Sequence, residues 1–135
     1  MNTPILQLLD NAASGLLFIS ESDAPLLPFF WPSDNPHLTP QHFAQMLAQL
    51  NRNDQNANIE TVTLQHFFRN ATQEEEWHDA EEAARAQQFR ALVKTLEDTL
   101  QNVQVFRVGE IAIDVFIIGE TEGGFAGLQT KVVET

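Results

Sequence analysis

Two consecutive apolar runs near the end of the chain place the strongest limit on its fold. Residues 103–108 and 111–118 are rich in β-branched side chains and are almost uninterrupted by polar residues. Such runs are typical of strands that are buried on both faces, because a strand with one wet face alternates apolar and polar side chains. A third run, 128–133, follows a turn at Gly123-Gly124. We therefore expect a mixed α/β fold whose sheet has helices above and below it.

Three helices are predicted to provide that cover. Thr3-Pro4 and Thr39-Pro40 each place a capping residue before a proline at the first helical position, followed by apolar residues at helical spacing. A longer helix of more than twenty residues begins at Asp79, where Glu82 completes a capping-box arrangement, and ends near Asn102.

The remaining elements are short. Residues 16–19 are predicted to form a buried strand that runs into a polar turn, Ser20 to Asp23, which places Glu21 on a loop. Residues 26–31 contain Pro28 and follow Pro25, which indicates an edge strand or an extended segment, with Trp31 in the core.

A second group of short elements follows the helix that starts at Thr39. Residues 59–64 alternate as a strand, and 65–69 form a helical turn that buries Phe67 or Phe68. The glycine-rich stretch 119–127 holds Glu120 and Glu122 and lacks the lysine of a phosphate-binding loop, so we expect a hairpin turn there.

Charge is the unusual part of the composition. Nineteen acidic residues face seven basic ones, the net charge is −12, and the first 51 residues contain no Lys or Arg. This balance argues against binding to nucleic acid or to anionic membranes, since both depend on clustered cations. It favours a cationic protein as the partner, because complementary fields speed and orient encounter.

Size and residue content limit the class of protein further. With 135 residues, 43% hydrophobic content and no cysteine, residues 1–135 are expected to form one globular domain without disulfides or a thiolate metal site. The N-terminus lacks the basic region of a secretory signal, and no run approaches the length of a membrane span, so we expect a cytoplasmic protein.

The end of the chain carries two carboxylates directly after the strand at 128–133. These are the Glu134 side chain and the free α-carboxylate of Thr135. A supported strand that leads into negative charge is suited to entering a cationic or metal-containing cleft of another protein. The opposing interpretation for Thr135 is a frayed terminus.

Trp77 lies within the densest run of acids. Six of them occupy nine positions around it: Glu74, Glu75, Glu76, Asp79, Glu81 and Glu82. Two interpretations of Trp77 are open: an aromatic residue that packs on the core at the start of a helix, or an interface anchor ringed by charge. For Glu21 the residues alone favour a solvated loop acid.

No catalytic or metal site is evident in the sequence. The four histidines, His37, His42, His66 and His78, are scattered and lack the spacing of a zinc helix. No spacing marks a serine nucleophile, and paired glutamates for acid–base chemistry cannot be identified in so acidic a chain. We therefore expect a protein that is not an enzyme and has no cofactor and no metal of its own.

Four sequence blocks closely resemble the cyanobacterial nuclease A inhibitor family. They are Ser14 to Ser22, Phe67 to Thr72, Gly109 to Thr121, and the ending Thr130 to Thr135. The resemblance extends over nearly the whole chain and is weakest between about Pro32 and Asn58.

The resemblance implies a three-layer α/β/α sandwich similar to pathogenesis-related protein 1, with a mostly antiparallel central sheet. It also implies an inhibitor that occupies the active site of a magnesium-dependent, sugar-nonspecific ββα-metal endonuclease. We expect the free form of the protein to be a monomer. In that family the C-terminal residue approaches the catalytic magnesium through water, with a loop glutamate and a tryptophan as further contacts; the matching positions here are Thr135, Glu21 and Trp77. Supporting contacts are expected from Ser20, Ser22, Glu75, Glu76 and Glu134.

Two alternatives stay open at this point. The same scaffold could serve as an acidic DNA mimic or adaptor for another basic protein. A hydrolase of the pathogenesis-related type would require a histidine and glutamate site converging in a groove, and clustered histidines in the fold would favour it.

Overall fold

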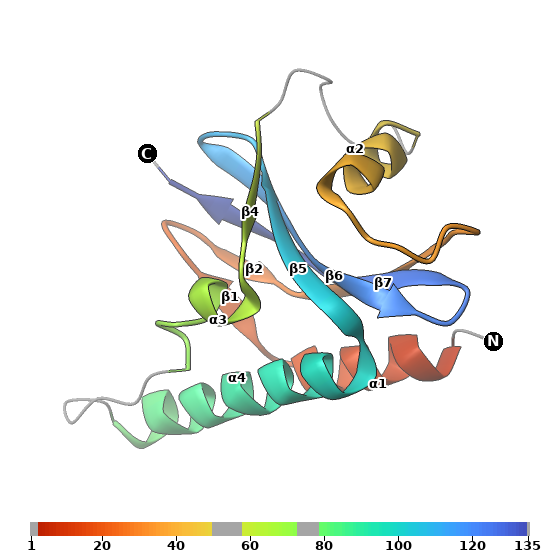
Figure 1. Cartoon of the computed structure of the whole chain (residues 1–135). Coiled ribbons are helices and arrows are strands. Elements are labelled where there is room, and N and C mark those ends of the chain that lie inside the picture. The colour runs from red at the N-terminus through yellow and green to blue at the C-terminus, as the bar shows by residue number, and fades with distance from the viewer. Residues whose placement is uncertain (1–2, 50–57, 73–78, 135) are drawn as a thin grey trace.

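The computed structural model describes residues 3–49, 58–72 and 79–134. Within these ranges the chain forms four helices and seven strands (Figure 1). The helices are α1 Thr3–Ala13, α2 Pro40–Gln49, α3 Leu64–Phe67 and α4 Ala80–Thr99. The strands are β1 Leu17–Ile19, β2 Asp23–Pro25, β3 Leu27–Pro32, β4 Ile59–Val62, β5 Gln101–Val108, β6 Ala112–Thr121 and β7 Gly124–Val133. No helix within the described ranges has both the length and the apolar character that crossing a membrane requires.

Five strands form one antiparallel sheet in the order β3-β7-β6-β5-β4. The central strand β6 is buried over most of its length, which confirms the prediction of a strand apolar on both faces for 111–118. In β5 the prediction holds in part: Val105, Phe106 and Val108 are buried, whereas Val103, Gln104 and Arg107 are partly exposed. β3 occupies one edge, as expected for a strand that carries Pro28 and Pro32. β4, with two exposed residues among its four, occupies the other edge.

Helices cover both faces of the sheet, as the sequence predicts (Figure 1). On one face, α1, α3 and α4 bury Leu9, Phe67 and Phe89 against the sheet. On the other face, Phe43 of α2 stacks on Phe106 of β5 with ring centroids 4.2 Å apart. Trp31, which is 8% exposed, belongs to this second cluster, so its prediction as a core residue is confirmed.

The predicted capping box at the start of α4 is present. The Asp79 carboxylate accepts a hydrogen bond from the Glu82 N–H at 2.8 Å, and the Glu82 carboxylate accepts from the Asp79 N–H at 3.4 Å. The helix ends at Thr99 rather than near Asn102. Asn102 takes a left-handed φ of 53° within an irregular start of β5, which asparagine tolerates better than most residues.

The glycine-rich stretch is a hairpin, as predicted, but its turn is much shorter than 119–127. β6 runs to Thr121 and β7 starts at Gly124, so Glu122 and Gly123 alone connect them. Gly127 lies inside β7, where a Cβ atom would lie 1.7 Å from the carbonyl oxygen of Ile117. Glycine is required at position 127 because the two strands approach each other closely there, and not because the chain turns there.

Two predictions for the short elements need correction. The strand predicted at 16–19 is present as β1, but it pairs with β2 in a separate two-stranded sheet. Leu16 is buried and Phe18 is partly buried, whereas Leu17 is 45% exposed, so the expectation of a buried strand was correct only in part. β2 lies partly within the segment predicted as a polar turn. The helical turn at 65–69 is confirmed as α3, and both Phe67 and Phe68 are buried.

Candidate functional site

The turn between β1 and β2 is hydrogen-bonded to the end of β7. The N–H of Val133 donates to Ser20 Oγ at 3.0 Å, across 113 residues of sequence. The N–H of Glu21 donates to the carbonyl oxygen of Val133 at 3.4 Å. Within the turn, the Ser20 N–H and hydroxyl both donate to the carbonyl oxygen of Ser22, at 2.9 and 3.2 Å. These bonds fix exposed Glu21 beside the last residues of β7.

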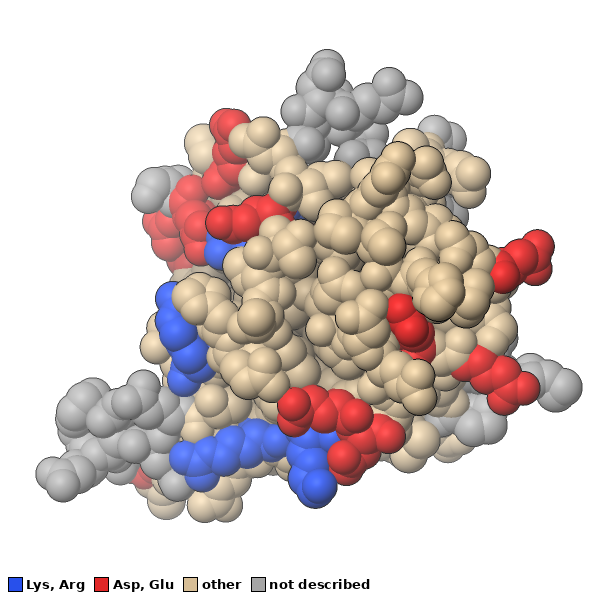
Figure 2. Space-filling model, viewed as in Figure 1, with Lys and Arg blue, Asp and Glu red and all other residues tan. Residues whose placement is uncertain are grey.

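Four exposed glutamates lie at this end of the sheet, which we call the acidic end: Glu21, Glu60, Glu110 and Glu134. Glu110 belongs to the β5–β6 turn and accepts from the Asn58 amide at 2.6 Å. Figure 2 shows acidic side chains gathered around the end of β7, with a basic side chain among them. Further Lys and Arg side chains lie along the left and lower edges of that view, and acidic side chains lie beside them over α4.

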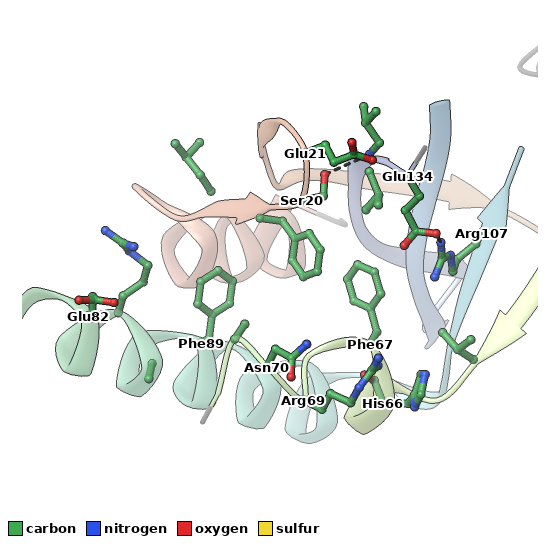
Figure 3. A pocket seen from close by; sticks show the side chains of 18 residues that line it. Ser20, Glu21, His66, Phe67, Arg69, Asn70, Glu82, Phe89, Arg107 and Glu134 are labelled. Atoms are coloured by element: carbon green, nitrogen blue, oxygen red, sulfur yellow. Dashed lines mark hydrogen bonds and ion pairs between the residues drawn. The ribbon is translucent and has the colours of Figure 1, made fainter. Parts of the chain in front are cut away.

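Arg107 pairs with two glutamates of the acidic end. Its Nη2 atom lies 2.5 Å from Glu134 Oε1, and its Nε atom lies 3.6 Å from Glu60 Oε1. The Arg107 side chain is 19% exposed, whereas those of Glu60 and Glu134 are 66% and 54% exposed. The Glu134 N–H also donates to the Ile111 carbonyl at 3.0 Å. The last described residue is therefore held by both its main chain and its side chain (Figure 3).

A pocket of about 650 Å³ opens beside these residues. Phe18, Phe67 and Phe89 supply apolar lining, and Glu21 and Glu134 lie along one side of it (Figure 3). Phe18 stacks on Phe67 with ring centroids 4.4 Å apart. Further cations line the pocket: Arg69 from the turn after α3 and Arg85 from α4, together with Arg107.

The pocket offers charged groups but no activated serine among the described residues. The hydroxyl of Ser20 donates to the Ser22 carbonyl and accepts from main-chain N–H groups, so its hydrogen bonds are all to backbone. In the described ranges, no group of three or more His, Cys, Asp or Glu residues is arranged to hold a metal ion.

The described histidines lie on both faces of the sheet. The His42 ring lies 3.1 Å from the His37 carbonyl through Nδ1 and packs edge-on against Phe125, on the α2 face of the sheet. His66 lines the pocket on the other face. His78 falls outside the described residues.

The fold brings together four of the residues predicted to contact a partner: Ser20, Glu21, Ser22 and Glu134. The other four, Glu75, Glu76, Trp77 and Thr135, lie outside the described residues, and their roles stay predictions. The helix that follows Trp77 lines the same pocket through Glu82 and Arg85.

Arg107 is the residue that the sequence prediction missed. A signal for it exists, since Arg107 is the single charged residue in a run, 103–108, predicted to be buried on both faces. A charge in such a run requires a partner, because an unpaired buried charge is costly. Which carboxylate would meet it could not be read from the sequence.

Comparison with protein-family models matches residues 3–135 to the family described as nuclease A inhibitor-like protein. The matched region contains the turn at Ser20 to Ser22, Arg107 and the end of β7. A search of curated proteins found no match.

Proposed function

Since the chain belongs to the nuclease A inhibitor-like family, we propose that it is a protein inhibitor that blocks the active site of a magnesium-dependent, sugar-nonspecific endonuclease. It acts by occupying the cleft of the nuclease and does no chemistry of its own. The contacts that we assign to the partner are Glu21, Trp77 and the carboxylate of Thr135, with Ser20, Ser22, Glu75, Glu76 and Glu134 beside them.

The observation that supports this proposal best is the hydrogen bonding between the Ser20–Ser22 turn and Val133. Because Ser20 Oγ and the Glu21 N–H both bond to Val133, Glu21 has a fixed place next to the end of β7. An exposed carboxylate on a rigid frame loses little conformational entropy when a partner binds it. Two predicted contact residues far apart in sequence, Glu21 and Glu134, thereby lie on one pocket.

The chemistry of the partner explains why carboxylates suit this role. A nuclease that cleaves phosphodiesters presents arginine and a divalent cation to phosphate oxygens. A carboxylate offers the same two-oxygen pattern to a guanidinium and is also a ligand for hard divalent cations. It contains no scissile bond, so it can hold those groups without being cleaved. The net charge of −12 would also accelerate encounter with a cationic cleft.

The proposal also covers the type of fold, the oligomeric state and the cellular location. Helices on both faces of an antiparallel sheet fit an α/β/α sandwich of the pathogenesis-related protein 1 kind. We expect a monomer that acts in the cytoplasm and protects its host from a nuclease before that enzyme is exported.

Titration against a purified magnesium-dependent nonspecific nuclease tests the function. Plasmid digestion should stop at one inhibitor per nuclease, and the complex should elute as a single species in gel filtration. Digestion that continues at a large excess of the protein, with no complex, would reject the proposal. Capture of a basic non-nuclease protein instead would favour the adaptor alternative.

Removal of Thr135 alone tests the terminal contact. We expect inhibition to fall sharply while the thermal midpoint hardly changes. Substitution Trp77→Ala should weaken inhibition through loss of an aromatic anchor. Full inhibition by the chain that lacks Thr135 would reject the role of the terminal carboxylate.

A further inference from the structure

The pocket beside the Ser20–Ser22 turn holds a large share of the basic side chains of this acidic chain. Six of the seven Lys and Arg residues lie within the described ranges, and three of these six line the pocket: Arg69, Arg85 and Arg107. The described acids that line it are also three: Glu21, Glu82 and Glu134. Over the whole chain, by contrast, acidic residues outnumber basic ones by nineteen to seven. An anion therefore meets less repulsion in this pocket than over the average of the surface.

The three arginines differ in how far the fold already uses them. Arg107 is paired with two glutamates. Arg69 donates one hydrogen bond, from Nη1 to the His66 carbonyl at 2.6 Å, which leaves most of the N–H groups of its guanidinium for other partners. Exposed Arg85 forms no ion pair and no side-chain hydrogen bond within the described ranges. Arg69 and Arg85 are thus the cations that a bound anion could use.

Between the charged groups the lining of the pocket is apolar. Phe67 and Phe89 are buried, and Phe18 and Ala71 are partly exposed. Figure 3 shows the rings of Phe67 and Phe89 between the acids on one side of the pocket and Arg69 with its neighbour on the other. The volume of about 650 Å³ falls within the range of small-molecule sites, roughly 300 to 1,000 Å³. Apolar walls with a few polar groups are typical of such sites.

We propose that this pocket binds a small apolar monocarboxylate, whose carboxylate is held by Arg69 and Asn70 and whose body packs against the phenylalanine rings. A guanidinium donates paired N–H groups to the two oxygens of a carboxylate. The Asn70 amide, which forms no hydrogen bond within the described parts of the chain, lies beside Arg69 and supplies a further donor (Figure 3). Arg85, from α4, adds a second positive charge to the same pocket. This site goes beyond nuclease inhibition and does not depend on it.

The charges around the pocket favour a ligand with one negative charge over a phosphate. Three glutamates lie among the lining residues, and the net charge of the chain is −12. A phosphate group carries close to two charges at neutral pH, so it would meet about twice the repulsion. Salt screens the more distant acids, because the Debye length is about 8 Å at physiological ionic strength. The arginines that touch the ligand are screened less, so a monocarboxylate can still be held.

Binding of phenylbutyrate to the purified chain tests the site without any nuclease. We expect changes in the ¹H–¹⁵N spectrum confined to residues that line the pocket, with a dissociation constant on the order of 0.1 to 1 mM for so small a ligand. The alcohol and the amine of the same carbon skeleton should bind at least about tenfold more weakly, because they lack the carboxylate.

Three outcomes of this titration would overturn the inference. Equal binding of the alcohol would mean that the pocket does not recognise charge. Tighter binding of inorganic phosphate than of phenylbutyrate would mean that the apolar lining contributes nothing. Spectral changes spread over the surface, or none at all at about 10 mM ligand, would mean that the pocket is not a ligand site.

Matched charge substitutions test the assigned contact. Arg69→Gln should raise the dissociation constant of phenylbutyrate about tenfold, because it removes the charged donor. Arg85→Gln should raise it only about two- to threefold, because that arginine contributes its charge and not the assigned hydrogen bonds. Lys94→Gln removes the same charge from an exposed position on α4 that does not line the pocket, and it should have no effect. Equal losses in all three variants would mean that net charge alone governs binding and would overturn the inference.

A substitution that keeps every charge gives an independent test. Ala71→Leu adds apolar volume at a partly exposed residue of the lining, so it should raise the dissociation constant more than about tenfold while the thermal midpoint shows a folded protein. It keeps the inference testable if Arg69→Gln, which loses the bond to the His66 carbonyl, fails to fold. Unchanged affinity in Ala71→Leu would overturn the inference. Binding of phenylbutyrate by a chain that inhibits no nuclease would support the pocket and reject the proposed function alone.

Discussion

Glu120, at the end of the sheet far from the acidic end, directs its carboxylate into the protein, whereas Glu21 remains exposed on its turn. The Glu120 carboxylate accepts from the Leu38 N–H and from the Asn102 amide, both at 2.9 Å. The Leu38 carbonyl in turn accepts from Asn102 and Gln104, at 3.1 and 3.0 Å. This network holds the segment before α2 against the sheet.

The difference between the ends lies in which atoms fix each glutamate. Glu120 is held by one oxygen of its carboxylate, Oε2, so its charge is used within the fold. Glu21 is held by its backbone, through its own N–H and the neighbouring Ser20 hydroxyl. Holding a residue by its backbone fixes its place on the surface, and Glu21 is exposed there. We infer that one end stabilises the protein and the other contacts a partner.

The largest effect should follow from Glu21→Ala. We expect the affinity for the nuclease to fall by about 3 kcal/mol, roughly a hundredfold, as for a central charged contact. The free energy of unfolding should change by less than about 0.5 kcal/mol, because the side chain is exposed. Isothermal titration and urea denaturation measure the two quantities. Asp23→Ala, in which an exposed acid two residues away is lost, is the control. If Glu21→Ala lowered the free energy of unfolding by as much as the binding free energy, the contrast between Glu21 and Glu120 would be wrong.

Glu120→Ala should produce the reverse pattern. Hydrogen bonds to a charged acceptor are lost, and the Leu38 N–H is left in a part-buried position, so the unfolding free energy should fall by about 2 kcal/mol. The inhibition constant should stay unchanged for the folded fraction. A weaker inhibitor of normal stability would show that the far end also contacts the partner.

Salt should act on encounter with the partner more than on the completed complex. Raising the ionic strength from about 0.05 to about 0.5 M should slow association roughly tenfold and change dissociation much less, because steering is long-range and screened. Stopped-flow fluorescence gives both rate constants. An association rate independent of salt would mean that the acidic end does not steer the approach of the nuclease.

The smallest effect is expected at Thr130, a buried residue of β7 whose hydroxyl has no hydrogen-bond partner in the described structure. Thr130→Val keeps the shape and removes the unsatisfied polar atom, so the unfolding free energy should rise by about 0.5 to 1 kcal/mol. Inhibition should not change. Thermal denaturation checks the gain, and a loss of stability would indicate that the hydroxyl bonds to an ordered water.

Much of the fold could be predicted because its signals are local. The capping box at Asp79, the prolines of β3 and the two-sided apolar character of β6 each depend on residues close in sequence. β2 could not be predicted, because a three-residue strand carries too little periodicity. Nor could the end of α4, which the bulge at Asn102 determines.

The candidate site, too, could be predicted from the sequence only in part. That Glu21 lies on a turn followed from the sequence, but its place beside Val133 depends on a serine hydroxyl that bonds across 113 residues. The choice of Glu60 and Glu134 as partners of Arg107 depends on the strand order β7-β6-β5-β4 and on the register of β4 with β5. Pairing of that kind is a property of the whole sheet and leaves no local pattern.

The way β7 ends has a further consequence. β3 pairs with β7 only as far as Leu27 opposite Gln129, so the last residues of β7 extend beyond that neighbour. An uncovered strand edge invites a second copy to add its own strand and begin aggregation. The Ser20–Glu21 turn already bonds to both the N–H and the carbonyl of Val133. The turn that presents Glu21 thus also covers the strand edge at Val133, and a second copy cannot pair with those two backbone groups while the turn is in place.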